Sequence, residues 1–171
     1  MPKEEINQQE SKQQHNAENN LKPSVSLNGH YIKELNIDNS NSPTSFLHQN
    51  ERPKIEVSVN FDNRNIRENI YEVVLVIKAR AKSEESSMDL FDVKLTYGVL
   101  ATLNNFTDDK QKEEILMIYL PNLLFPYARR VISDATSDSG FQPLLLEHID
   151  FSSLYNQRKN ELNDGSKQSD N

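Results

Sequence analysis

The sequence has no cysteine and no tryptophan, and it has four glycines among its 171 residues. Without cysteine there is no disulfide, no thiolate nucleophile and no sulfur ligand for a metal. The glycines form neither a G-x-G-x-x-G nor a P-loop pattern, which excludes the common phosphate-cradling loops. No apolar run approaches about 18 residues, so we expect no transmembrane helix and no direct membrane insertion.

Basic charge is also in short supply. The chain has 19 Lys and Arg against 26 Asp and Glu, and residues 25–155 carry 13 basic and 19 acidic side chains. The acidity therefore belongs to the middle of the chain. It argues against nucleic acid as a partner and favours basic or neutral partners. The N-terminus lacks the basic-then-apolar pattern of a secretion signal, so we expect a cytoplasmic protein.

Motifs that carry catalysis are missing as well. The four histidines are scattered, without metal-ligand spacing, and no serine sits in a G-x-S-x-G turn. Adjacent carboxylates occur at Glu84–Glu85, at Asp108–Asp109 and at Glu113–Glu114, in a predicted turn and at a predicted helix start. These positions favour solvated or capping roles. The sequence predicts no enzyme, no cofactor and no metal site.

Both ends of the chain are polar. Residues 1–24 and 161–171 contain almost nothing apolar and predict disordered tails, because they cannot bury enough surface to offset chain entropy. Residues 25–160 are left as one domain.

Four segments of this domain alternate with period two, which predicts strands. They are 25–38, 54–62, 70–82 and 88–100. Each has one apolar and one largely polar face, typical of an antiparallel sheet covered on one side. In the first segment we place Val25, Leu27, Tyr31, Leu35 and Ile37 on the apolar face and Ile32 on the other. Short polar connections predict hairpins between the second and third strands and between the third and fourth.

The connection between the first two strands is about 15 residues, a length at which loops are often functional. It carries Phe46 and Leu47 side by side. These residues either tuck under the loop as a small satellite core or line a groove.

The pattern turns helical after residue 103. One helix is predicted over 108–120, capped by Thr107 or Asp108, and a second from Asn122 as cap to about Thr136. The second has two apolar stripes, and a sheet needs one. The other stripe predicts contact with a second copy of the chain. A last helix is predicted from Phe151 to about Glu161, with Asp150 as its cap.

One stretch resembles a known family. Residues 120–155, LPNLLFPYARRVISDATSDSGFQPLLLEHIDFSSLY, are similar to a run in the SecB family of export chaperones. IYEVVLVIKARAK (70–82) and YIKELNID (31–38) resemble two further SecB segments, and the likeness covers about residues 25–160. It implies an α+β fold, with a four-stranded antiparallel sheet and helices on one face, assembled as a homotetramer that is a dimer of dimers.

The resemblance also implies a function. SecB proteins are holdases that bind unfolded precursor proteins without nucleotide and deliver them to SecA for export. By resemblance, the SecA-binding face contains Glu34, Asp38, Leu90 and Asp92. The client groove contains Phe46, Leu47, Phe151, Leu154 and Tyr155. The oligomer interface contains Leu124, Phe125, Tyr127, Ala128, Val131 and Ile132.

Two departures from the family pattern and three alternatives remain open. Glu51 stands where SecB proteins often have an aromatic residue, and Thr96-Tyr97-Gly98 replaces a Gly-Gly of some members. The alternatives are a SecB-like chaperone of an antitoxin, a general cytosolic holdase without an export role, and an enzyme or ligand-binding protein on an α+β scaffold. The short polar C-terminal tail does not support the first, and no polar pocket with converging charges supports the last.

Overall fold

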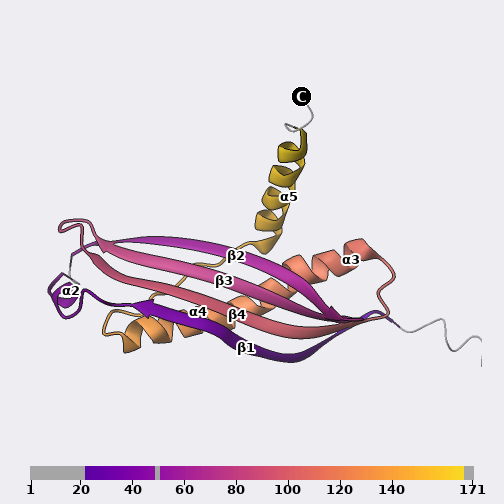
Figure 1. Cartoon of the computed structure of the whole chain (residues 1–171), viewed down its shortest axis with the longest axis horizontal. Coiled ribbons are helices and arrows are strands. Elements are labelled where there is room, and N and C mark those ends of the chain that lie inside the picture. Colours follow the sequence, from indigo (N-terminus) through magenta and orange to yellow (C-terminus); the bar gives the residue numbers. More distant parts are fainter. Residues whose placement is uncertain (1–21, 49–50, 168–171) are drawn as a thin grey trace, which may run out of the picture.

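The computed structural model describes residues 22–48 and 51–167, and it contains one four-stranded antiparallel sheet. The strands are β1 (Ser24–Asp38), β2 (Pro53–Arg67), β3 (Ile70–Ser83) and β4 (Asp89–Asn104), in the order β1-β4-β3-β2 (Figure 1). The helices are α2 (Thr44–Leu47), α3 (Asp109–Glu114), the π-helical turn η1 (Ile115–Tyr119), α4 (Leu120–Asp138) and α5 (Phe151–Lys167). The predicted N-terminal tail lies almost entirely outside the described residues.

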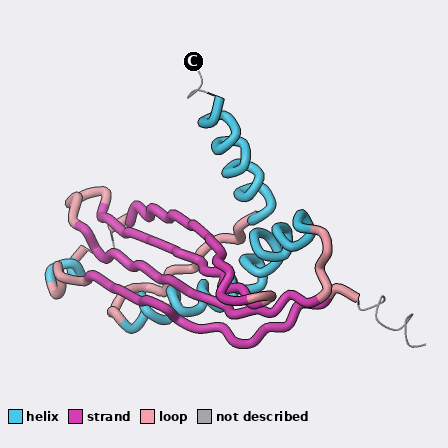
Figure 2. Tube along the Cα trace, turned by 45° about the vertical axis from the view of Figure 1, so that its right-hand side comes forward, coloured by secondary structure: helices cyan, strands magenta, loops and turns pink. Residues whose placement is uncertain are grey.

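The core lies between the sheet and α4, on one face of the sheet. Odd-numbered residues of β3 and β4, such as Val73, Leu75, Val93 and Leu95, are fully buried there. Figures 1 and 2 show α4 running behind the strands, with no described helix over the opposite face. The predicted α+β fold with one covered sheet face is therefore confirmed, and the uncovered side is called the open face below.

The hairpins join the strands as predicted, but β2 is longer than expected. It continues to Arg67, and β3 begins at Ile70, so Glu68 and Asn69 alone form the turn. Glu68 has φ of 39°. The segment from 63 to 67 is mostly polar and is typical of a loop in sequence, but its backbone pairs with β3. Since β1 and β2 lie at opposite edges, the connection between them crosses one end of the whole sheet.

The predicted facing of β1 is wrong in its middle. The register with β4 shifts between Leu27 and Gly29 and again between Ile32 and Glu34, at two β-bulges. Each bulge adds one residue and reverses which side chains face the core. Tyr31, opposite Gly98, therefore lies on the open face, and Ile32, opposite Tyr97, lies on the helix side.

The predicted pair of helices is one continuous helical segment. Asp108 is the cap, accepting a hydrogen bond from the Lys110 N–H. The prediction that Asn122 caps a second helix is wrong, because its side chain donates to the Ile118 carbonyl at 2.9 Å from inside α4. The π turn lies just before Pro121. In this turn the Leu120 N–H donates to the Ile115 carbonyl, five residues back. Extra backbone length at this turn accommodates the proline without ending the helix.

The last helix begins as predicted. Asp150 accepts hydrogen bonds from the N–H groups of Ser152 and Ser153 at 2.9 and 3.2 Å. The helix continues to Lys167, beyond the predicted end at Glu161. Figures 1 and 2 show α5 projecting away from the sheet. Its first residue, Phe151, anchors it in the core.

Candidate functional site: an edge groove and an open sheet face

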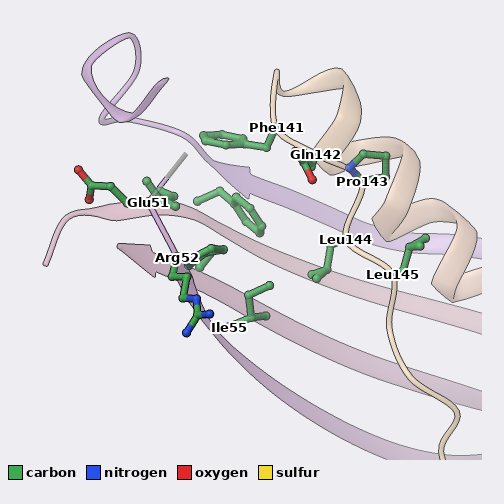
Figure 3. A pocket seen from close by; sticks show the side chains of 12 residues that line it. Glu51, Arg52, Ile55, Phe141, Gln142, Pro143, Leu144 and Leu145 are labelled. Atoms are coloured by element: carbon green, nitrogen blue, oxygen red, sulfur yellow. The ribbon is translucent and has the colours of Figure 1, made fainter. Parts of the chain in front are cut away.

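A groove runs along the outer edge of β2, between this strand and the crossover segment 141–150. It consists of two adjoining cavities of about 650 and 640 Å³, which share Ile55, Leu144 and Leu145. The first is also lined by Glu51, Arg52, Pro53, Ala81, Leu90, Phe91, Phe141, Gln142 and Pro143, and the second by Val57, Val59, Leu146–Asp150, Ser153, Leu154 and Gln157. Figure 3 shows the first cavity, with Ile55 and Leu144 facing it from opposite sides.

Large apolar side chains line this groove and remain exposed. Ile55, Val57 and Leu145 keep 43%, 46% and 67% of their surface in contact with solvent. β2 is also an edge strand, and within the described residues it pairs with β3 alone. One side of its backbone therefore offers N–H and C=O groups beside an apolar wall. The groove can hold an extended peptide chain by its side chains and its backbone together.

The crossover segment is held in place at the end of α4. Gly140, with φ of +89°, reverses the chain, and the Gly140 and Phe141 N–H groups donate to the Ser137 and Thr136 carbonyls. This pattern is a Schellman motif, which needs a residue that tolerates positive φ. The buried Thr136 hydroxyl accepts the Leu144 N–H at 2.9 Å. Leu144 is thereby turned inward, and Leu145 is left facing outward.

The structure does not bring all predicted groove residues to this groove. Leu154 lines the second cavity, and Tyr155 is half-buried beside Lys159. Phe46 packs on Phe141, with ring centroids 5.3 Å apart, at the end of the first cavity. Leu47 is 79% exposed on α2. Of the two alternatives for the long loop, the small satellite core therefore fits Phe46. Leu47 belongs neither to this core nor to the lining of the groove.

Phe151 is a core residue and needs correction as a groove residue. It is fully buried, with its ring 5.6 Å from the Phe61 ring and 5.8 Å from the Phe125 ring. It offers no surface to a ligand. Sequence reasoning missed Ile55, Val57, Leu144 and Leu145 as groove residues. Two features of the sequence pointed to them: the apolar side of β2, and the apolar run PLLLEHI (143–149), which belongs to no predicted helix or strand.

Glu51 lies at the end of the first cavity and is tied to the sheet. Its carboxylate accepts a hydrogen bond from the Ser83 hydroxyl, and its Oε1 lies 2.6 Å from Nδ1 of His48. The Ser83 hydrogen bond, followed by that of His48, lowers the pKa of Glu51 to about 2. Figure 3 shows this carboxylate pointing away from Leu144. An ionised group thus stands at the groove end, fastened to the β3–β4 turn.

Three of the four predicted partner-binding residues lie together on the open face. Asp38 is opposite Asp92 in the register, and Glu34 is opposite Thr96, four residues further along β4. Their carboxylates are paired inside the chain: Lys94 Nζ lies 2.8 Å from Glu34 Oε2, and Arg80 Nε lies 3.2 Å from Asp92 Oδ2. Asp38 accepts the Ser40 N–H, which lowers its pKa.

Leu90 is misplaced in the predicted set. It is 3% exposed, and it lines the end of the groove. It also lines a small cleft of about 70 Å³, together with Asp38, Arg80 and Asp92. A register shift where β4 begins opposite the end of β3 breaks the alternation there. Leu90 therefore supplies groove wall, and it does not supply an exposed apolar element of the open face.

The open face also holds a buried carboxylate that sequence reasoning did not single out. Glu72 accepts hydrogen bonds from Tyr31 Oη at 2.5 Å, Lys33 Nζ at 2.8 Å and Arg64 Nε at 2.5 Å. The Tyr31 ring crosses above Gly98, where an added Cβ would lie 3.1 Å from it. Burial raises the pKa of Glu72, but the three donors outweigh it and lower this pKa to about 2. The cluster links β1, β2 and β3 across β4.

The predicted oligomer interface divides in two. Leu124, Phe125, Ala128 and Ile132 are buried against the sheet of the same chain, so they have no surface left for a second copy. Tyr127 is 47% exposed and Val131 is half-buried. Of the six predicted interface residues, these two expose surface that a second copy could contact.

Neither a metal site nor a membrane span is found in the part of the chain that the structure describes. It contains no group of three or more His, Asp or Glu side chains that could hold a metal ion. It also contains no helix that is long and apolar enough to cross a membrane.

Residues 18–162 match the family model described as preprotein translocase subunit SecB. The chain belongs to the SecB family. Protein-export proteins SecB of Rickettsia akari and Rickettsia typhi are each 38% identical to it, over 84% and 81% of this chain and 93% and 90% of the relatives. The predictions of a SecB-family protein-export chaperone, and of a chain that is not an enzyme, are confirmed by this membership.

The fold has a solved counterpart. A SecB-like chaperone of Mycobacterium tuberculosis, solved with a ChAD peptide from an antitoxin, superposes with a TM-score of 0.60. The match covers 73% of this chain and 90% of that chain, at 12% identity. It supports the SecB-like fold and nothing finer.

Proposed function

We propose that this SecB-family chain is an ATP-independent holdase that binds unfolded precursor proteins in the cytoplasm and passes them to SecA. The edge groove is the client site, and the open face around Glu34, Asp38 and Asp92 is the SecA-binding site. One observation carries the proposal: two adjoining cavities beside an edge strand, lined by apolar side chains that remain exposed. Exposed apolar patches of this kind mark interaction surfaces.

The groove suits a client recognised by composition more than by sequence. Burying apolar side chains against Ile55, Val57 and Leu145 is favourable whatever their order along the client. An extended client can also pair with the free edge of β2. Neither interaction needs a nucleotide or another cofactor, and both are lost once the client folds and buries the same groups.

The homotetramer belongs to the same proposal. Tyr127 on α4 stacks near His30 of β1, with ring centroids 4.5 Å apart. On the same side of β1, Leu27 and Ile32 are each 47% exposed. These side chains and Val131 form an apolar surface that a second copy would cover.

Groove substitutions on an exposed strand edge test the client site. Ile55→Ser combined with Val57→Ser should weaken capture of an unfolded precursor about tenfold or more, because two half-exposed apolar side chains are removed from the contact. The measurement is retardation of the refolding of a model precursor at increasing chaperone concentration. Ile66→Ser is the matched control, since Ile66 lies on the same strand, is 45% exposed and does not line either cavity. Equal retardation by the double variant and wild type would place the client elsewhere.

Export is the proposed use, since the relatives at 38% identity are protein-export proteins. The likeness to the antitoxin-bound chaperone, at 12% identity, gives no support for a role with antitoxins.

A further inference from the structure

The carboxylates of the proposed docking face are already engaged within the chain. Lys94 Nζ contacts both Glu34 oxygens, at 2.9 and 2.8 Å, and bridges β4 to β1. Arg80 Nε donates to Asp92 Oδ2 at 3.2 Å and bridges β3 to β4. Both pairs follow from the register, since Asp92 is directly opposite Arg80, and Glu34 is diagonal to Lys94.

The charged groups of both ion pairs are exposed to solvent, and within each pair the positive charge compensates the negative one. Arg80 and Asp92 side chains are 56% and 44% exposed, and those of Lys94 and Glu34 are 39% and 48% exposed. Each carboxylate lies beside a cation, and the hydrogen bond from Lys94 lowers the pKa of Glu34. At a distance the two charges of each pair largely cancel, so this face attracts a basic surface less than its count of acidic residues suggests.

We infer that Arg80 and Lys94 set the strength and specificity of docking at the open face, by holding Asp92 and Glu34 in internal ion pairs that a cationic partner must displace. The inference rests on the proposed docking of SecA at this face. The group that replaces Arg80 or Lys94 is a lysine or arginine side chain of the partner, because a neutral group would leave a carboxylate without its counter-charge.

This arrangement favours a well-matched partner over a merely basic one. Exchange of one cation for another recovers little energy, since the pair that breaks is equivalent to the pair that forms. A partner gains when several of its cations meet Glu34, Asp38 and Asp92 in their spacing on the sheet. A loosely basic surface gains much less, so the internal pairs act against wrong partners.

A comparison of two substitutions with the same charge change tests the inference. Arg80→Gln and Lys78→Gln each remove one positive charge from the open face of β3, two residues apart. Lys78 forms no ion pair among the residues that the structure describes. Arg80→Gln should tighten SecA binding about two- to fivefold more than Lys78→Gln at low salt, the range expected for one exposed ion pair. Lys94→Gln should do the same through Glu34.

The dissociation constant for purified SecA, measured by calorimetry or by surface-immobilised binding, gives the readout. In an Asp92→Asn background the advantage of Arg80→Gln over Lys78→Gln should vanish, because the carboxylate that Arg80 holds is gone. If Arg80→Gln and Lys78→Gln change the dissociation constant equally, the inference is overturned, since net charge alone would then explain binding. Weaker binding of Arg80→Gln would overturn it too, and would make Arg80 a direct contact.

Failure of the docking proposal itself looks different. If Asp92→Lys leaves SecA affinity unchanged at low salt, SecA does not use this face, and the inference falls with it. If Asp92→Lys weakens SecA binding while Arg80→Gln and Lys78→Gln remain equal, the docking proposal stands and the inference alone is wrong.

Discussion

The edge groove and the open face of the same sheet satisfy their side chains in opposite ways. In the groove, Ile55, Val57 and Leu145 are left exposed with no apolar partner over them within the described residues. On the open face, Glu34 and Asp92 each have a cation from a neighbouring strand. Apolar attraction has no preferred direction, so an unfinished apolar surface binds many sequences. A surface of paired charges binds few sequences, because a cation of the binding partner must compete with the cation already paired within the chain.

Strand geometry keeps these two surfaces apart. On β2, Ile55, Val57 and Val59 point to the groove, and Lys54 and Glu56 form an ion pair on the other side at 2.8 Å. Alternation with period two lets one strand serve both surfaces without sharing a side chain. Substitutions on one surface should therefore leave binding at the other unchanged.

Separating the protomers has the largest expected effect. Val131→Asp places a carboxylate at a half-buried position that packs against the core and, in our proposal, against a second copy. An unpaired charge there should cost several kcal/mol and remove the tetramer. Client capture should fall more than SecA docking per protomer, because a long client can span several grooves at once. Native mass spectrometry and the two binding assays check this.

The control for this variant is Ser137→Asp, an exposed substitution on the same helix. It should keep the native mass of the wild type. A folded Val131→Asp tetramer of unchanged mass would remove α4 from the interface.

Removing the charge of the buried carboxylate on the open face has the next largest expected effect. Glu72→Gln removes the charge that Tyr31, Lys33 and Arg64 share, and should cost about 2 kcal/mol of unfolding free energy at pH 7. The pKa of Glu72 is lowered from 4.5 to about 2, so the stability that it contributes is present above pH 4.5 and is lost as pH falls toward 2. The difference between variant and wild type should shrink over that window.

Urea denaturation at fixed protein concentration, repeated from pH 7 down to pH 2, measures this difference. Glu68→Gln, at an exposed turn position, should be neutral throughout. A Glu72→Gln deficit that is constant with pH would mean that packing, and not charge, holds the cluster together. Client capture should be unaffected at pH 7, since the cluster lies away from the groove residues.

The sequence predicts the sheet well because alternation is a local signal. The β3 segment and the β4 segment from Phe91 onward show this alternation, and their odd-numbered side faces the core as predicted. The two bulges of β1 are set by pairing with β4, which no window of β1 contains, so Tyr31 and Ile32 were assigned to the wrong faces. The same limit explains Leu90, whose side is decided by a register shift at the start of β4.

The site residues were harder to predict than the fold, for a related reason. Whether an apolar residue lies in the core or lines a groove depends on what covers it, and coverage is a tertiary property. Phe151 and Leu154 share one side of a predicted helix, but Phe151 is sealed between two aromatic rings and Leu154 opens to a cavity. The resemblance to the SecB family implied that a client groove exists, and packing decides which side chains form it.

Salt provides the finest test of the contrast between the two surfaces. Exposed charges are screened beyond a Debye length of about 8 Å at physiological ionic strength, whereas apolar burial is little affected by moderate salt. Asp92→Lys should therefore weaken SecA binding severalfold at low salt and progressively less as salt rises, with client capture unchanged. Leu145→Ser, on the crossover segment, should weaken client capture by a similar factor at every salt concentration, with SecA binding unchanged. Both affinities are to be measured on each variant from about 0.05 to 0.5 M salt, a range that shortens the Debye length about threefold. If both variants lose both activities together, the groove and the open face form one site, because two independent surfaces cannot respond alike to a charge on one and an apolar side chain on the other.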